Sequence, residues 1–243
     1  MIDENRVPSP SLAGEKEAIR VVPAALCSAL AIALVLSRVA FTGNRSFLFL
    51  GWNLILAWIP VLMAYAIARV PRGRAHWPKL FALGAVWLVF FPNAPYLVTD
   101  LLHLGSSGPV PKWFDVSMLF TFAWTGCVLG FLSLSLVHSR VRQAAGGAAG
   151  WAFVVAVSTL AGFGVYLGRF KRWNSWDVVA EPDDLLRDLA GIALNPADQP
   201  RALGFTAQFA ALVVAGYVSF LQTRCIFCSP NTSHPAPTAT DRS

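Results

Sequence analysis

Charged residues are scarce in this chain. Only 13% of its 243 residues are charged, whereas globular proteins carry about a quarter. Between residues 18 and 176 the only two acids are Asp100 and Asp115. A soluble domain of this length would need far more charge to cover its surface, so the composition excludes a soluble enzyme and a disordered chain. The formal net charge of +6 does not indicate nucleic-acid binding, because the basic residues lie at the ends of apolar runs.

Several familiar chemical motifs are also absent. The chain has no glycine-rich phosphate loop, no nucleophile elbow and no paired-histidine metal motif. Cys225-x-x-Cys228 is a single pair without a second pair or a nearby histidine, which does not make a zinc site. The sequence therefore indicates no metal and leaves any cofactor unknown.

Long apolar runs fill most of the chain. A helix needs roughly 20 apolar residues to cross about 30 Å of hydrocarbon, where its backbone groups must bond internally. The first run is long enough only if Arg38 extends its charged end to the membrane interface. We therefore predict an all-α fold, a polytopic transmembrane helical bundle within residues 20–223. Its six predicted spans are residues 21–41, 46–68, 80–99, 116–137, 146–168 and 202–223.

Three segments lie outside these spans. Residues 1–19 form a polar N-terminal segment, and residues 224–243 form a tail rich in Pro, Ser and Thr that we expect to be disordered. The only long connection contains a proline followed by two acids, which is typical of a helix start, and apolar residues then recur at helical spacing. We predict a short amphipathic helix near residues 182–194 on the membrane surface.

The distribution of Lys and Arg predicts the orientation. Eleven of the 19 basic residues fall at the two termini and in the second and fourth loops. Since basic residues are enriched on the cytoplasmic side, both termini are predicted to be cytoplasmic. For either orientation, the third and fifth loops lie on one side of the membrane.

The third span contains two prolines where a helix break is unusual. Pro92 lies about 20 Å into the bilayer, and Pro92 and Pro95 both lack the backbone donor that a helix requires. We therefore predict that the third helix is broken here. If it resumes, Asp100 and His103 share a face. The segment is either a polar site in the outer third of the bilayer, or a kink capped by Asn93 in which the acid and the histidine only mark the interface.

A second polar segment, residues 168–177, begins the fifth loop. It is typical of an interfacial anchor, in which tryptophans lie at headgroup level and basic residues meet lipid phosphate. An anchor has no need for Asn174, Ser175 or Asp177, however. Arg169 and Arg172 also offer planar forks for phosphate or carboxylate. This segment is the second candidate for a binding site.

Two weaker patterns favour structural roles. Trp113-Phe114-Asp115 is typical of an aromatic belt with a helix cap. Gly126-x-x-x-Gly130 and Gly164-x-x-x-Gly168 indicate close packing between membrane helices.

Three motifs together resemble a known family. They are Phe-Pro-Asn-Ala-Pro-Tyr-Leu-Val-Thr-Asp-Leu-Leu-His at 91–103, Trp-Phe-Asp at 113–115 and Tyr-Leu-Gly-Arg-Phe-Lys-Arg-Trp-Asn-Ser-Trp-Asp at 166–177. This pattern resembles the bacterial membrane family named domain of unknown function 1361, over roughly residues 45–222. The resemblance implies a multi-pass protein of the bacterial cytoplasmic (inner) membrane. It implies no catalytic role, because the family carries no assigned activity.

Three functions remain open from the residues. The first is a ligand or substrate site at one membrane face, with no reaction assigned and with an anionic lipid headgroup or a small anion as ligand. The second is a transporter with a discontinuous third helix, and the third is an assembly or docking partner without catalysis. Candidate catalytic residues are Asp100, His103, Asp115 and Asp177, and candidate binding residues are Asn93, Tyr96, Arg169, Arg172, Trp173, Asn174 and Trp176.

The separate motifs are predicted to form one site. We expect residues 96–100 to lie beside residues 173–177, with the acids Asp100, Asp115 and Asp177 gathered in one pocket. Such acids would repel one another unless nearby basic residues or a bound cation offset their charge.

Overall fold

The computed structural model describes residues 10–105, 110–194 and 199–228. Within these ranges the chain forms helices joined by short connections, which confirms the predicted all-α bundle. Six helical stretches are long and apolar enough to cross a membrane, and each overlaps one of the predicted spans. They are Val21–Thr42, Phe49–Arg69, Arg74–His103, Lys112–Ala145, Gly147–Lys171 and Pro200–Thr223.

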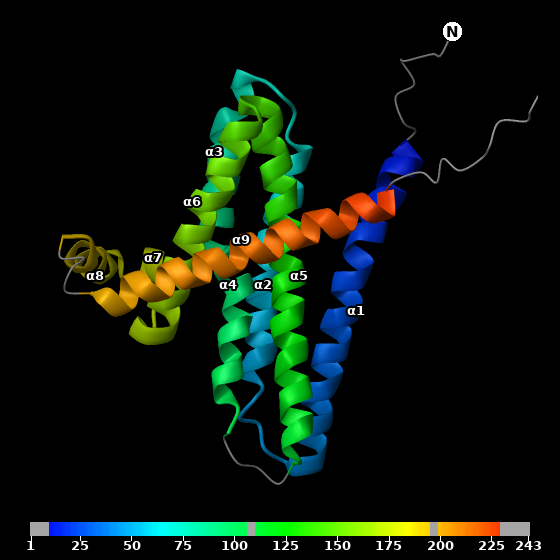
Figure 1. The fold of residues 1–243 in the computed structure, drawn as a ribbon, viewed down its shortest axis with the longest axis vertical. Coiled ribbons are helices and arrows are strands. Elements are labelled where there is room, and N and C mark those ends of the chain that lie inside the picture. The colour runs from blue at the N-terminus through cyan, green and yellow to red at the C-terminus, as the bar shows by residue number, and fades with distance from the viewer. Residues whose placement is uncertain (1–9, 106–109, 195–198, 229–243) are drawn as a thin grey trace, which may run out of the picture.

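The central element is α5 (Lys112–Ala145), a single uninterrupted helix. It packs against α1 (Pro10–Thr42), α2 (Phe49–Arg69) and α6 (Gly147–Tyr166). The last helix, α9 (Pro200–Cys228), packs mainly against α6 and runs obliquely across the bundle (Figure 1). Two large buried apolar clusters lie in the interior. One lies between α1, α2 and α5, and the other lies between α2, α3 (Trp77–Phe90), α5, α6 and α9.

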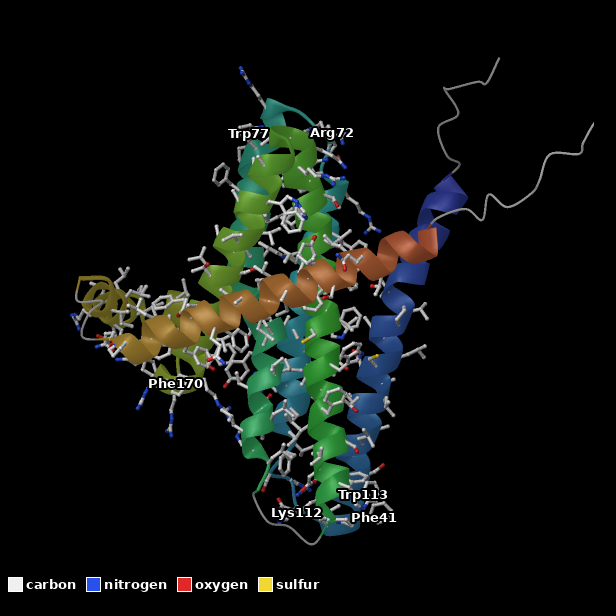
Figure 2. The ribbon with its side chains drawn as sticks, in the orientation of Figure 1. Phe41, Arg72, Trp77, Lys112, Trp113 and Phe170 are labelled. Atoms are coloured by element: carbon white, nitrogen blue, oxygen red, sulfur yellow. The ribbon has the colours of Figure 1, made fainter. Side chains whose placement is uncertain are left out.

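The connections between the first five spans alternate between the two ends of the bundle, whereas α7 (Asp177–Ala180) and α8 (Pro182–Leu194) of the fifth loop lie beside the bundle at mid-height in Figure 1. In Figure 1 the α1–α2 connection and the start of α5 lie at the lower end, and the α2–α3 and α5–α6 connections lie at the upper end. Exposed aromatic side chains mark both ends: Phe41 and Trp113 lie beside Lys112 at one end, and Trp77 lies with Arg72 at the other (Figure 2). This distribution is typical of the aromatic belts at membrane interfaces.

The third span is broken, as the prolines predict. A short 3₁₀ turn, η1 (Arg74–His76), leads into α3 (Trp77–Phe90). After a turn at residues 91–92 the chain forms one turn of α-helix, α4 (Asn93–Tyr96), and then the 3₁₀ helix η2 (Leu97–His103).

The fifth loop contains most of the remaining structure. It begins with a π-helical turn, η3 (Leu167–Lys171), and continues through α7 (Asp177–Ala180) into α8 (Pro182–Leu194). The bounds of α8 agree with the predicted amphipathic helix. Its apolar residues Leu185, Leu189 and Ile192 pack against Tyr166 and Leu167 of the bundle.

Two predicted boundaries differ from the structure. The polar N-terminal segment does not end at residue 19 as a separate unit, because α1 already begins at Pro10; residues 1–9 lie outside the described residues. The tail predicted from residue 224 begins later, because α9 continues to Cys228. The predicted disorder of residues 229–243 concerns a segment outside the described residues.

Candidate functional site

The break between α3 and α4 is stabilised by the asparagine between the two prolines. The backbone N–H of Ala94 bonds to the carbonyl of Phe91, at 3.2 Å, rather than to that of Phe90 as a continuous helix would require. The side-chain Nδ2 of Asn93 donates instead to the Phe90 carbonyl at 2.9 Å. Asn93 therefore caps the kink. The same side chain also contacts Ser175, in the second motif.

Both glycine pairs hold this broken segment by close packing. A Cβ built on Gly126 of α5 would overlap the carbonyl oxygen of Ala94, and it would lie 2.9 Å from Cβ of Leu97. On the opposite side, a Cβ on Gly164 of α6 would lie 2.7 Å from Cγ of Pro92. Gly126 lets α5 approach the backbone of α4, and Gly164 lets α6 approach the ring of Pro92 just before α4, so the broken segment is held between the two helices.

A strained turn ends η3 within the second motif. Arg172 adopts a left-handed conformation with φ of 63°, and the N–H of Trp173 bonds back to the carbonyl of Leu167 at 3.2 Å. Arginine here occupies the left-handed position after a helix that usually holds glycine, and the bond to Leu167 closes the wide π-helical turn. The chain therefore turns sharply and returns residues 173–178 toward the bundle.

The next turn is closed by Asp177. Its Oδ2 accepts a hydrogen bond from the backbone N–H of Asn174 at 2.6 Å. The indole Nε1 of Trp173 donates to Oδ2 of Asp188 in α8 at 2.9 Å, and Lys171 pairs with the same carboxylate at 3.5 Å. Asp177 thus stabilises the turn of its own loop. The contacts of Asp188 with Trp173 and Lys171 hold α8 against this loop.

The two polar motifs lie side by side in the structure. Asn93 Nδ2 donates to the Ser175 hydroxyl at 2.8 Å, and that hydroxyl donates to the carbonyl of Val89 at 3.3 Å. A Cβ on Gly168 would lie 3.2 Å from the ring of Tyr96. Residues 93–96 and 168–175 therefore form one contact region, although they are far apart in the sequence.

Asp100 and Arg169 form an ion pair inside this region. Asp100 is fully buried, and its Oδ1 lies 3.6 Å from Nη1 of Arg169. Asn53 of α2 donates to the other carboxylate oxygen at 3.1 Å. Asp100 and His103 share a face because a 3₁₀ helix repeats every three residues, and Nη2 of Arg169 lies 3.4 Å from Nδ1 of His103. The ring of His103 also packs against Phe49, with centroids 5.1 Å apart.

The expectation that three acids share one pocket is wrong. Asp115 pairs with Arg38, whose Nε lies 2.7 Å from Oδ1 of the carboxylate. Asp100 pairs with Arg169, and Asp177 closes its own turn. Each acid therefore has a separate role in the packing of the chain.

Arg38, which the sequence predicts to extend its charged end to the interface, is buried within the bundle, with a side chain that is 2% exposed. The guanidinium forms a two-point contact with Asp115 and lies 4.2 Å above the ring of Phe47. Arg38 turns inward because a carboxylate and an aromatic face are available within the bundle, which offsets the cost of burying its charge.

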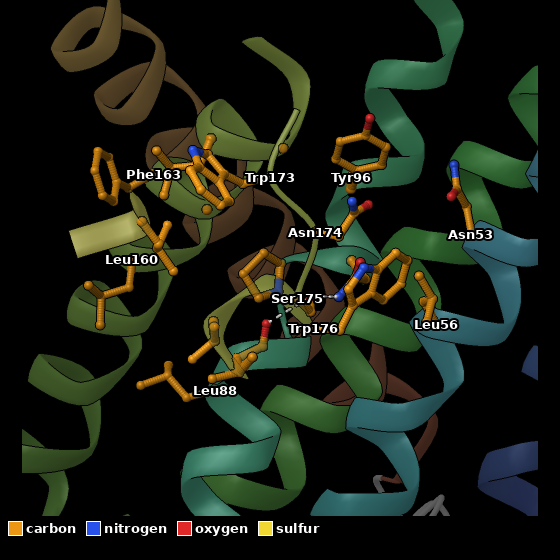
Figure 3. Close-up of a pocket in the computed structure, with 18 of the residues that line it drawn as sticks. Asn53, Leu56, Leu88, Tyr96, Leu160, Phe163, Trp173, Asn174, Ser175 and Trp176 are labelled. Carbon is orange, nitrogen blue, oxygen red and sulfur yellow. Dashed lines mark hydrogen bonds between the residues drawn. The ribbon is translucent and has the colours of Figure 1, made fainter. Parts of the chain in front are cut away.

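A cavity of about 390 Å³ lies where the two motifs meet. This volume is within the range of small-molecule sites. Figure 3 shows Asn53, Tyr96, Trp173 and Trp176 arranged around it. Its lining comes from α2, the broken third span, α6, the second motif and α8: Trp52, Asn53, Leu56, Leu88, Val89, Pro92, Asn93, Tyr96, Leu160, Phe163, Gly164, Leu167, Gly168, Trp173, Asn174, Ser175, Trp176, Val178, Leu185 and Leu189.

Not all sequence candidates reach this cavity. Asn93, Tyr96, Trp173, Asn174 and Trp176 line it. The other six candidates are outside its lining: Asp100, His103, Asp115, Asp177, Arg169 and Arg172. Of these, Arg172 is exposed, and Arg169 is directed toward Asp100. In the described part of the chain, no group of three or more His, Cys, Asp or Glu side chains is arranged to hold a metal ion.

Comparison with known protein families matches residues 52–215 to the family described as protein of unknown function (DUF1361). The chain belongs to this family. Searches of curated proteins and of solved structures gave no match. The DUF1361 region begins at Trp52 and contains every residue that lines the cavity, whereas Arg38 lies outside it.

One contributor to the DUF1361 cavity was not identified from the sequence. Asn53 lines the cavity and also holds Asp100. A signal for it existed, since it is the single amide in the apolar run 46–68 and polar residues within membrane helices usually have a partner. Ser175 was recognised as a residue that an interfacial anchor does not need, but its contacts could not be derived, because they depend on where Asn93 and Val89 lie.

Proposed function

We propose that this DUF1361 protein is a multi-pass protein of the bacterial cytoplasmic membrane that binds an amphiphilic ligand in the cavity between its two polar motifs. The convergence of Asn93, Tyr96 and the 173–176 segment on one cavity carries this proposal. A concave, mostly apolar wall with a few polar groups is the usual form of a small-molecule site.

The exposed part of the cavity lining supports entry from the bilayer. Five large apolar lining residues are 36–53% exposed: Trp52, Leu88, Leu160, Trp176 and Val178. Three of them lie on helices that are apolar enough to span a membrane. A ligand with an acyl chain can therefore leave that chain among the lipids while its polar end occupies the cavity.

The positions of the acids favour binding over catalysis. Asp100 is held by Arg169 and Asn53, Asp115 is held by Arg38, and Asp177 is held by its own turn. A general acid or base must come within hydrogen-bonding reach of the reacting group. Because none of these carboxylates belongs to the cavity lining, we assign no reaction to the site.

A transporter is the second candidate, because the discontinuous third span lines the cavity. Broken helices form the substrate sites of many transporters. The contacts of Gly126 and Gly164 with the broken segment nevertheless favour a fixed site over a moving gate, since displacing α4 would separate two closely packed interfaces.

For orientation, we propose that both termini are cytoplasmic. This assignment follows from the excess of Lys and Arg at the termini and in the second and fourth loops. The lower end of the bundle in Figure 1, where η2 ends and α5 begins, then faces the opposite side of the membrane.

Filling the cavity tests the proposal. Replacement of Val178, which lines the cavity, by Trp places an indole where the ligand would lie. Replacement of Val155 by Trp is the matched control, because Val155 is an exposed valine on α6 outside the lining. Native mass spectrometry of protein extracted from its own membranes should show one retained amphiphile in the wild type and in V155W, and its loss in V178W. Equal retention in all three proteins would contradict a ligand in this cavity.

A further inference from the structure

The amide side chains around the cavity direct their nitrogens to the protein. Nδ2 of Asn93 donates to both the Phe90 carbonyl and the Ser175 hydroxyl, at 2.9 and 2.8 Å. Nδ2 of Asn53 donates to Asp100 at 3.1 Å, and Nδ2 of Asn174 lies 3.4 Å from Oδ2 of Asp177. The amide oxygens of these three residues form no hydrogen bond within the described part of the chain. The polar part of the wall is therefore rich in acceptors.

Few donors remain for a ligand. The Ser175 hydroxyl already donates to the Val89 carbonyl at 3.3 Å. The Tyr96 hydroxyl can either donate or accept, and the indole N–H groups of Trp52 and Trp176, which also line the cavity, can donate. A ligand that satisfies the three amide oxygens must nevertheless carry hydrogen-bond donors of its own.

The wall is also uncharged. None of the 20 described residues that line the cavity carries a charge. Arg169 is paired with Asp100 and contacts His103, so its guanidinium is not directed to the cavity. A phosphate or carboxylate placed here would lose its water without gaining a cation, which is strongly unfavourable for a full negative charge. The cavity therefore does not suit an anionic headgroup.

Three tryptophans add flat apolar surfaces. Trp52, Trp173 and Trp176 line the cavity, and the rings of Trp52 and Trp176 meet edge to face with centroids 6.4 Å apart. Flat aromatic faces pack well against the C–H surface of a sugar or glycerol unit, while the hydroxyls at its rim remain free to donate to acceptors.

We infer that the cavity binds a lipid whose uncharged headgroup carries several hydroxyl groups, such as a glycosylated diacylglycerol. The hydroxyls donate to the amide oxygens of Asn53, Asn93 and Asn174, and the acyl chains leave past Leu88 and Leu160. This inference rests on the proposed function, because it names the ligand class of the same cavity.

The test compares two lipids with the same acyl chains and different headgroups. Purified full-length protein in tetraethylene glycol octyl ether, a detergent without a sugar, is titrated with digalactosyl diacylglycerol or with phosphatidylglycerol. Native mass spectrometry measures the apparent Kd of each. Digalactosyl diacylglycerol should bind at least about tenfold tighter, which corresponds to one or two additional hydrogen bonds.

Asn174→Leu tests the amide acceptors directly. Asn174 is exposed, and its backbone N–H can still bond to Asp177 after the substitution. The variant should weaken binding of the galactolipid about three- to tenfold and leave binding of phosphatidylglycerol unchanged. Asn44→Leu is the matched control, because Asn44 is an exposed asparagine in the α1–α2 connection, remote from the cavity lining.

The outcomes separate the inference from the proposed function. Equal or tighter binding of phosphatidylglycerol would overturn the inference; if V178W abolishes that binding, the cavity still binds a lipid and the proposed function stands. Galactolipid binding that is unaffected by N174L would overturn the role of the amide acceptors. If V178W changes the binding of neither lipid, the proposed function fails together with the inference.

Discussion

The contact between α5 and the broken segment makes Gly126 a sensitive test of this structure. In Gly126→Ala, the new Cβ would overlap the carbonyl oxygen of Ala94 and lie 2.9 Å from Cβ of Leu97. Carbon atoms in contact prefer separations of about 3.5–4.0 Å. Neither neighbour is the end of a flexible side chain, so α4 must move away from α5 by roughly 1 Å, given that contact distance.

The expected cost follows from two opposing effects. Overpacking of this kind costs about 1–3 kcal/mol, and a backbone obstacle places this site at the upper end. Replacement of glycine by alanine within a helix contributes up to about 1 kcal/mol of stabilisation. The net loss should be about 2 kcal/mol. Gly84→Ala is the matched control, because a Cβ on Gly84 of α3 meets no atom within 4 Å and only the helical gain remains.

The measurement is the thermal midpoint of purified protein in detergent, followed as the monodisperse fraction on size-exclusion chromatography. The two variants should differ by about 3 kcal/mol, with the gain at Gly84 added to the loss at Gly126. For a chain of this size that difference corresponds to midpoints about 6–12 °C apart. If Gly126→Ala is as stable as Gly84→Ala, then α4 does not pack against α5 as described.

Two further predictions concern the buried ion pair and the orientation. Arg38→Met should lower the free energy of unfolding by up to about 3 kcal/mol, because it leaves the Asp115 carboxylate, which is only 14% exposed, without its partner. Addition of Asp115→Leu should recover most of that loss. Thermal midpoints of both variants measure this, and a double variant no more stable than the single one would refute it. In a background without native cysteines, cysteines at Lys112 and Arg187 should react with an impermeant thiol reagent in intact cells, while a cysteine at Arg72 should not; the reverse pattern would invert the proposed topology.

The sequence predicted those features that depend on neighbouring residues. The length of each apolar run determines a membrane helix, because backbone groups in hydrocarbon must bond within the segment. Pro92 and Pro95 break the third span because they lack backbone donors. The proline, acids and apolar spacing at 182–194 predict α8 for reasons that are equally local.

The two glycine pairs were recognised as packing sites, but their partner could not be derived from the sequence. Both pairs pack against the broken segment: Gly126 faces Ala94, and Gly164 faces Pro92. Small residues show where a backbone can approach, but they do not specify which backbone approaches.

The pairing of charges depended entirely on tertiary structure. Arg38 has an apolar stem long enough to reach the interface, and nothing in the local pattern indicates a pairing with a carboxylate 77 residues later. Likewise, local rules brought Asp100 and His103 to one face, but they could not place Asn53 and Arg169 beside that face. Which charged groups meet is set by the rotation of each helix about its own axis, and packing with the other helices fixes that rotation.

The sequence by itself thus determined the membrane helices, the position of the break and the two polar motifs, because each follows from local composition and backbone chemistry. Tertiary structure decided that Asn93 meets Ser175, 82 residues away, and that a cavity forms between them. It also separated the acids into different contacts and left the cavity wall uncharged. These outcomes arise because close packing at Gly126 and Gly164 fixes how α4, α5 and α6 face one another.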